Sequence, residues 1–439
     1  LVSVATQTSG VGGTSWRTEL SVFNAGTQGA SVSFLFLASG TTATKTIFLS
    51  PKQSVTYANA LLDLFGIGTG AGALAIEATS AGTTADLRVT SRTFITGATG
   101  TYGQAVPDVQ PADLERTLYI TGMQSTSAYR TNVGLVNRGS APVTAALTLY
   151  DSTGKALATK SVALAANSFQ QSPLGSYFPA INNTSQAVLT MKLVATSQDA
   201  VSGYASVIDN LSQDPIYIQA VPAATGGTLT IPVVGRSPGV NGTFWRSDVT
   251  LFNPGATQLN LTLRYNGATI TRALGAGDTT VIRDILSAYG QSSGSGTLVV
   301  TWNSGTGPVA TTRTYTTTSG GGTYGQSIDP VSSFATRNFV PGLRNDGSFR
   351  SNVGFVNGGA EAETFTVLLL SSSGSELGRK TLSLGANAQM QQSVASLFPN
   401  AFLGGGFTLQ VQGDANARLF AYGSMVDNRS GDPVFFAGR

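Results

Sequence analysis

One short signature recurs four times along the chain, at intervals long enough to hold a whole folded domain. It reads aromatic, Arg, Ser or Thr, polar, apolar, small or hydroxyl, two apolar residues, Asn, any residue and Gly. The copies are WRTELSVFNAG from Trp16, YRTNVGLVNRG from Tyr129, WRSDVTLFNPG from Trp245 and FRSNVGFVNGG from Phe349. Consecutive copies start roughly 110 residues apart, which suits a β-sandwich domain and is too long for a propeller blade or a solenoid coil.

The four copies are of two types, which alternate. The first and third share a late segment, TSRTFITGATGTYGQ from Thr90 and TTRTYTTTSGGGTYGQ from Thr311. The second and fourth share a different one, YASVIDNLSQDPIYIQA from Tyr204 and YGSMVDNRSGDPVFFAG from Tyr422. The order is therefore A-B-A-B. We predict four domains: A1 over residues 1–113, B1 over 114–224, A2 over 225–334 and B2 over 335–439. Short linkers lead us to expect that neighbouring repeats touch, as in a stiff rod.

Within each copy the pattern predicts strands. The signature strand ends at Asn-x-Gly, a turn in which Asn and Gly can take the left-handed conformation. A strand rich in β-branched and apolar residues follows, and then a corner of Leu, two small residues and a polar pair. Short helical patches come next, at ALLDLFG, LGSYFP, VIRDILSAYG and VASLFP. The sequence predicts an all-β chain of four tandem Ig-like β-sandwich domains, each with a short helical insert.

The composition argues against catalysis and metal binding. The chain has no Cys and no His, so it lacks thiolate ligands, the usual zinc ligand and the commonest general base. We expect no enzyme activity, no cofactor and no metal. The net charge is only +3, and no run of basic residues is present, which argues against nucleic-acid binding. The longest apolar runs fall far short of the ~20 residues of a membrane helix. We expect a secreted, extracellular protein whose signal peptide has been removed.

The Asn-x-Gly turns with the corners that follow them resemble bacterial extracellular Ig-like repeats of the CARDB and ASH kind. The residues that carry this resemblance are Asn24 and Gly26, Asn137 and Gly139, Asn253 and Gly255, and Asn357 and Gly359. The resemblance implies a spacer, adhesive or assembly module on the outside of a bacterium, and it implies no reaction.

Two recurring motifs could bind ligands. The aromatic-Arg pair that opens each signature suits sugar or cation–π contacts. Its presence in every copy favours a structural role, because neighbours in a strand face opposite ways. The segments Asp209–Asp214 and Asp427–Asp432 could supply oxygen ligands for calcium. The Pro that follows each segment favours a tight turn between two strands instead.

Two functions remain open. The first is a structural subunit of a bacterial surface filament, sheath or layer, whose partner is another copy of itself. A terminal strand could then complete a neighbour's sheet, with Leu1, Val2, Val4, Phe435 and Phe436 as the assembly residues. The segment from Leu1 to Gln7 is the favoured donor strand. The alternative for it is that it forms the first strand of its own domain. The second function is an adhesin stalk or a binding array for glycans or other surface proteins, with Tyr102 and Tyr324 in Gly-rich loops as contact residues.

Overall fold

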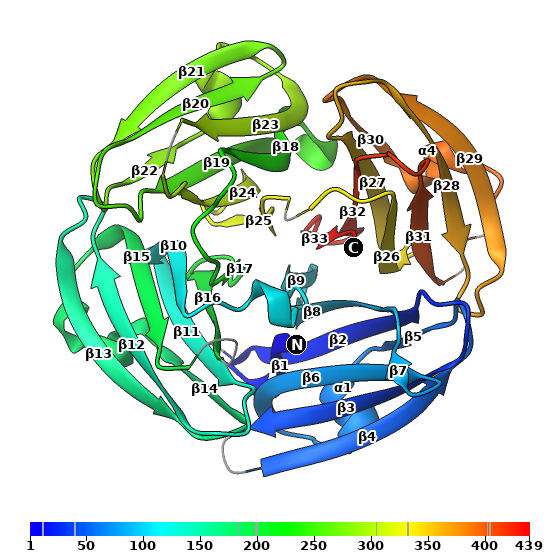
Figure 1. Cartoon of the computed structure of the whole chain (residues 1–439), viewed down its shortest axis with the longest axis horizontal. Helices are drawn as coiled ribbons and strands as arrows, with labels where there is room; N and C mark the ends of the chain where they lie inside the picture. The colour runs from blue at the N-terminus through cyan, green and yellow to red at the C-terminus, as the bar shows by residue number, and fades with distance from the viewer. Residues whose placement is uncertain are drawn as a thin grey trace. The chain divides into compact units, whose positions relative to one another are not determined.

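The structure is a computed structural model that describes residues 1–10, 13–38, 41–182, 184–197, 201–303, 305–331, 333–401, 403 and 405–439. It is nearly all β, as predicted, and divides into two compact units (Figure 1). Unit 1 combines Leu1–Asp108 with Ser332–Arg439, and unit 2 is Val109–Val331. Unit 2 therefore pairs repeats B1 and A2, which are neighbours in sequence. Unit 1 pairs A1 with B2 from the opposite end of the sequence, a contact that the expected rod does not contain.

Each B-type repeat has two four-stranded antiparallel sheets. In B1 the strand orders are β10-β15-β12-β13 and β14-β11-β16-β17, and in B2 they are β26-β31-β28-β29 and β30-β27-β32-β33. The B1 strands are β10 (Thr117–Ser125), β11 (Tyr129–Asn137), β12 (Val143–Tyr150), β13 (Ala156–Leu164), β14 (Ser168–Pro173), β15 (Gln186–Ala195), β16 (Val201–Asp209) and β17 (Pro215–Gln219). The B2 strands are β26 (Arg337–Arg344), β27 (Phe349–Asn357), β28 (Glu363–Leu370), β29 (Glu376–Leu384), β30 (Gln389–Ser393), β31 (Gly406–Gln412), β32 (Leu419–Asp427) and β33 (Pro433–Ala437).

The A-type repeats have the same strand neighbours, but their first strand joins the two layers. The A1 strands are β1 (Val2–Ser9), β2 (Ser15–Asn24), β3 (Ala30–Ala38), β4 (Thr41–Leu49), β5 (Ser54–Tyr57), β6 (Gly70–Ser80), β7 (Thr83–Thr84), β8 (Leu87–Gly97) and β9 (Gly100–Ala105). The A2 strands are β18 (Thr228–Pro238), β19 (Phe244–Phe252), β20 (Leu259–Tyr265), β21 (Ala268–Leu274), β22 (Thr279–Ile282), β23 (Gly294–Trp302), β24 (Val309–Thr317) and β25 (Thr323–Ser327). Strand β1 pairs with β6 and, at its end, with β2, and β18 pairs with β23 and β19 in the same way.

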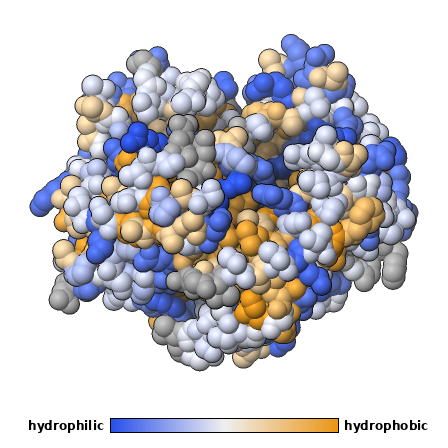
Figure 2. Space-filling model, turned by 60° about the horizontal axis from the view of Figure 1, so that its bottom comes forward, coloured by the Kyte–Doolittle hydropathy of each residue, from blue (hydrophilic) through white to orange (hydrophobic). Residues whose placement is uncertain are grey.

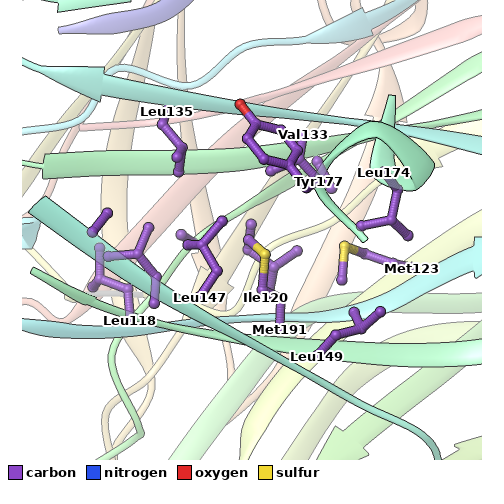
Figure 3. Packing of buried hydrophobic residues seen from close by; sticks show 14 of the residues in the cluster. Leu118, Ile120, Met123, Val133, Leu135, Leu147, Leu149, Leu174, Tyr177 and Met191 are labelled. Carbon is purple, nitrogen blue, oxygen red and sulfur yellow. The ribbon is translucent and has the colours of Figure 1, made fainter. Parts of the chain in front are cut away.

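The core of each B-type repeat lies between its two sheets. In B1 the alternating residues of β12, Val143, Ala145, Leu147 and Leu149, point inward and are buried. Figure 3 shows Leu147 and Leu149 in one cluster with Val133 and Leu135 of the opposite sheet. This period of two, with one face apolar and the other polar, is typical of a half-buried strand.

The Asn of the signature stabilises a corner in all four repeats. Asn24, Asn137, Asn253 and Asn357 are almost completely buried. The Asn24 amide donates to the carbonyls of Gln28, Leu49 and Ser50, and its Oδ1 accepts from the amide of Gly26. The other three Asn side chains repeat this set of bonds, including those to the corner Leu and the residue after it. The left-handed backbone expected at these residues is wrong, because side-chain hydrogen bonds form the turn instead.

A short helix follows the fifth strand of each repeat, as expected. The helices are α1 (Ala60–Phe65), α2 (Leu174–Tyr177), α3 (Ile285–Ala288) and α4 (Val394–Leu397), and 3₁₀ turns occur at Pro111–Asp113, Pro179–Ile181 and Val240–Gly242. The apolar positions of α1, Leu61 and Leu64, are buried against the sandwich. At its start the amide of Leu62 donates to the Asn59 side chain, and the amide of Asn59 donates to Asp63 at 2.9 Å.

Candidate functional site

The turn between β16 and β17 attaches repeat B1 to repeat A2 within unit 2. Asp209 ends β16, and its Oδ1 accepts hydrogen bonds from the backbone amides of Leu211 and Ser212 at 2.8 and 3.0 Å. Its Oδ2 accepts from the amide and the hydroxyl of Thr323 in β25, both at 2.8 Å. Asp214 precedes β17, and its Oδ2 accepts from the amide of Gly325 at 3.0 Å. Two carboxylates of one repeat thus satisfy backbone donors on the last strand of the other.

Unit 1 contains the same contact between B2 and A1. Asp427 accepts from the amides of Arg429 and Ser430 through Oδ1, and from the amide and hydroxyl of Thr101 through Oδ2. Asp432 accepts from the amide of Gly103 at 2.9 Å. Strand β9, like β25, ends its sheet order, so these amides face outward from an edge strand. The carboxylates bind donors that would otherwise be open to pairing with another chain.

Burial and hydrogen bonding shift the pKa values of these carboxylates. Burial alone raises the pKa of Asp209, but hydrogen bonds from Ser212 and Thr323 outweigh it and hold the pKa below its ordinary value. The pKa of Asp427 is lowered in the same way, burial being outweighed by its bonds to Ser430 and Thr101. Asp214 is fully enclosed, and burial raises its pKa well above the ordinary value despite the charge of Arg313 nearby.

Three further contacts recur in both units. The Oγ1 of Thr311 donates to the carbonyl of Thr121 in unit 2, and that of Thr90 donates to the carbonyl of Pro341 in unit 1. An aromatic pair packs beside each bond, Tyr119 with Phe252 and Phe339 with Phe23, with ring centroids 5.5 and 5.2 Å apart. The turn after β12 and the turn after β28 each accept an amide hydrogen bond from the A-type repeat, from Thr279 to Ser152 and from Ser54 to Ser372, both at 2.9 Å.

The two Asp segments therefore act as turns, and both oxygens of their first carboxylates, Asp209 and Asp427, already accept hydrogen bonds. The four donors on Asp209 take up the oxygen lone pairs that a calcium ion would need. Within the described ranges, no cluster of three or more Asp, Glu, His or Cys is arranged to hold a metal ion. Sequence reasoning found the turns and missed their role in docking. The signal was present, because the late segments that distinguish A from B are the two complementary halves of this contact.

The aromatic-Arg pairs lie at the start of β2, β11, β19 and β27, and each Arg contacts its own repeat. Arg130 donates to Asn210 at 2.7 Å and to Gln213 at 2.8 Å, and so stabilises the turn that follows Asp209. Arg350 donates to Asn428 at 3.0 Å in the equivalent turn. In the A-type repeats Arg17 and Arg246 lie over aromatic rings of the neighbouring strand, Phe94 at 5.5 Å and Tyr315 at 5.0 Å. These contacts favour the structural interpretation of the motif.

The predicted assembly residues lie in paired strands. Val2 and Val4 are buried in β1, which Leu1 precedes, and β1 is bonded within its own repeat to β6 and β2. Phe435 and Phe436 are buried in β33, which pairs with β32. These positions match the alternative interpretation, in which both strands belong to their own domains.

The two predicted contact tyrosines occupy equivalent positions in β9 and β25. Tyr324 is buried and packs edge-on against Trp245, with centroids 5.7 Å apart. Tyr102 is half-buried, and its hydroxyl lies 2.9 Å from that of Thr99 in the same loop. The structure thus brings Tyr324 into the framework of A2 and leaves Tyr102 partly open.

The surface is polar without being strongly charged. Figure 2 shows one face, on which pale residues of intermediate hydropathy are interspersed with hydrophilic and hydrophobic ones. Large exposed hydrophobic side chains include Phe48, Leu62, Leu211 and Val240. Among the described helices, none has the length and apolar character required to cross a membrane.

Comparison with known proteins does not assign a family. No family model matches the chain, and no curated protein matches it. Among solved structures it is similar to a β-glucuronidase from glycoside hydrolase family 2, at 7% identity and a TM-score of 0.12, over 49% of this chain and 24% of that one. It is also similar to the pilus backbone RrgB from Streptococcus pneumoniae, at 10% identity and a TM-score of 0.12, over 80% of this chain and 86% of that one. A bacterial ice-binding adhesin matches at 14% identity and a TM-score of 0.11, over 74% and 90%. Scores this low carry no functional argument, so the function rests on the chain's own residues.

Proposed function

We propose that the chain is a non-enzymatic extracellular structural protein, a self-assembling subunit of a bacterial surface filament, sheath or layer. The observation that carries this proposal is the docking contact that recurs in both units. The polar motifs that the repeats share, the Asp turns and the aromatic-Arg pairs, hold strands and repeats together. The Asp turns join the two repeats of a unit, and the Arg130 side chain stabilises such a turn within its own repeat, as expected of a structural protein.

Composition supports the same proposal. A chain without His or Cys, with 53 Gly and only 11% charged residues, offers few groups for acid–base or nucleophilic catalysis. A weakly charged surface of this kind is poorly protected against self-association. The resemblance to CARDB and ASH repeats implies an extracellular assembly role of the same sort.

The outer sheet edges are the most direct route to self-assembly. Strands β4, β13, β21 and β29 each end a strand order. Strand β1 is paired with β6 and β2 in its own repeat, and β33, which also ends a strand order, has Phe435 and Phe436 buried. Lys45, Lys160 and Lys380 are exposed in three of these edge strands, and a Lys of this kind discourages uncontrolled pairing. Phe48 in β4 is 67% exposed and gives that edge an apolar contact.

Negative-stain electron microscopy across a concentration series tests this proposal. We expect regular filaments or sheets above a threshold concentration. Phe48→Lys adds a second charge to β4 and should raise that threshold, whereas Leu62→Lys, which places the same charge at an exposed position of α1, should not. Discrete particles at every concentration would overturn self-assembly and favour the adhesin or binding-array function. Loss of filaments in both variants would exclude β4 as the contact.

A further inference from the structure

Unit 2 has a partly open cavity of about 270 Å³ between its two repeats. One wall comes from B1 and is apolar, with Val188, Val207, Ile216 and Ile218 among its residues. The other wall comes from A2 and carries Arg246, Arg283 and Arg313, against one acidic residue, Asp248. Its volume lies just below the ~300–1,000 Å³ of typical ligand sites. The cavity thus joins an apolar half to a half with excess positive charge.

Two of these arginines bond to neutral groups. Arg246 donates to the hydroxyl of Thr317 at 2.7 Å, and Arg313 donates to the hydroxyl of Thr323 at 2.8 Å. In the part of the chain that the structure describes, the Nε atoms of both arginines have no hydrogen-bond partner. The carboxylate of Asp214 lies 4.0 Å from Arg313, beyond hydrogen-bond range.

The carboxylate of Asp248 bonds to Arg283 and to the backbone amide of Asp284. Its Oδ2 accepts from Arg283 at 3.1 Å, and its Oδ1 accepts from the amide of Asp284 at 2.8 Å. The Arg283 side chain is 67% exposed, so this pair lies at the rim of the cavity. The acidic group of the cavity wall is therefore already engaged, and the positive charge of Arg246 and Arg313 remains.

The equivalent residues of unit 1 form a buried ion pair that the described residues of unit 2 do not form at these positions. At the positions of Asp248 and Arg313, unit 1 has Glu19 and Arg92, and the Glu19 carboxylate lies 3.3 Å from the Arg92 guanidinium. Arg344, which replaces Gln124, lies 4.0 Å from the same carboxylate. Phe349 covers both guanidinium groups, at 4.6 Å from Arg92 and 4.4 Å from Arg344. In unit 1 a carboxylate thus lies 3.3 Å from Arg92, whereas in unit 2 the ion-pair partner described for Arg313 is Asp214, at 4.0 Å.

From this comparison we infer that the cavity of unit 2 binds a small organic carboxylate with an apolar body. Its carboxylate takes the place beside Arg313 that Glu19 holds beside Arg92, and its apolar body lies against Val207, Ile216 and Ile218. This inference goes beyond the structural function and does not depend on it, because a surface subunit and a binding array could each contain such a site.

Titration calorimetry of the full chain with benzoate tests the inference, with benzamide and acetate as matched probes. Benzamide keeps the ring without the charge, and acetate keeps the charge without the ring. We expect benzoate to bind at least about tenfold more tightly than either. It should exceed benzamide because hydrogen bonds to charged groups are the stronger kind, and acetate because only the ring buries apolar surface against the B1 wall. Binding should weaken as salt is added. Absence of benzoate binding, or equal binding of benzamide, would overturn the inference.

Single substitutions test which residues bind benzoate. Arg246→Gln should weaken benzoate binding at least about tenfold, whereas Arg17→Gln, the same change in A1, should leave it unaltered. Asp248→Glu lengthens the acidic side chain to that of Glu19, so we expect it to occupy the place beside Arg313 and to abolish binding. If Arg246→Gln unfolds unit 2, Asp248→Glu still decides the question. Wild-type affinity in Asp248→Glu would contradict the inference.

Discussion

The two units use the same strands to join an A-type and a B-type repeat, yet they differ at the centre of the joint. In unit 1 the ion pair of Glu19 and Arg92 is almost fully buried, with side chains 10% and 4% exposed. In unit 2 the equivalent acid, Asp248, is one methylene shorter and pairs with the exposed Arg283. The Glu19 carboxylate thus pairs inside the joint, whereas the Asp248 carboxylate pairs at its exposed rim. The shared docking contacts hold the repeats together, and the centre is free to vary.

The largest expected effect comes from removing the acid at this position. Glu19→Ala leaves the Arg92 guanidinium buried without its partner, so we expect unit 1 to lose about 3–5 kcal/mol of unfolding free energy. Asp248→Ala releases an Arg that already reaches solvent, and we expect unit 2 to lose about 1–2 kcal/mol. Urea unfolding with hydrogen exchange resolved to peptides of each unit measures both losses. Equal losses would show that the two centres are energetically alike.

The docking carboxylates should behave alike in the two units. Asp427→Asn and Asp209→Asn each place an amide where an oxygen accepts from backbone donors. We expect each to cost about 1.5–3 kcal/mol, the range for hydrogen bonds to a charged group. Protection of the β9 or β25 amides against hydrogen exchange should fall only in the unit that carries the change. The control is Asp414→Asn, because Asp414 is exposed and also accepts a backbone amide hydrogen bond, from Asn416 at 2.7 Å. A loss as large in this variant would argue against a special role for docking.

Much of this architecture could be predicted from the sequence, since its signals are local. The β-branched and apolar residues of SVSFLFLA predicted a strand, which lies within β3, and the helical patch at Ala60 is α1. The Asn of the signature was correctly placed at a turn, but its bonds reach Leu49 and Ser50, far along the chain, so its mechanism was wrong. The pairing of A1 with B2 was beyond reach, because no local pattern tells which repeats meet. The cavity depends on side chains from strands that are distant in the sequence, which no local pattern relates.

The turns that follow β12 and β28 provide a third comparison. Gly154 and Gly374 have φ angles of +77° and +85°, and an added Cβ would lie 2.9 Å from atoms of Gly277 and Lys52 in the partner repeat. We expect Gly154→Ala and Gly374→Ala to cost about 1–2 kcal/mol for the left-handed backbone alone, and more for the lost docking. Gly267→Ala is the control, since its φ is +83° with open space around it. Thermal unfolding in which all three variants match would show that these turns bear no docking energy.

Low pH should weaken the contact between the A-type and B-type repeats in both units. We expect this to be the smallest of the four effects. The folded pKa values of Asp209 and Asp427 are lowered, so each contributes stability that is complete above its unfolded pKa of about 3.9 and is lost as the pH falls through the folded value. Asp214 acts in the opposite sense, because its raised folded pKa gives stability that is lost as the pH rises. We therefore expect unfolding free energy to fall below about pH 4, and to fall less in Asp427→Asn, which no longer titrates at that position. Parallel pH profiles for this variant and the wild type would mean that Asp427 is not the group that acid releases, and the shared joint would then have to be held by its aromatic and glycine contacts.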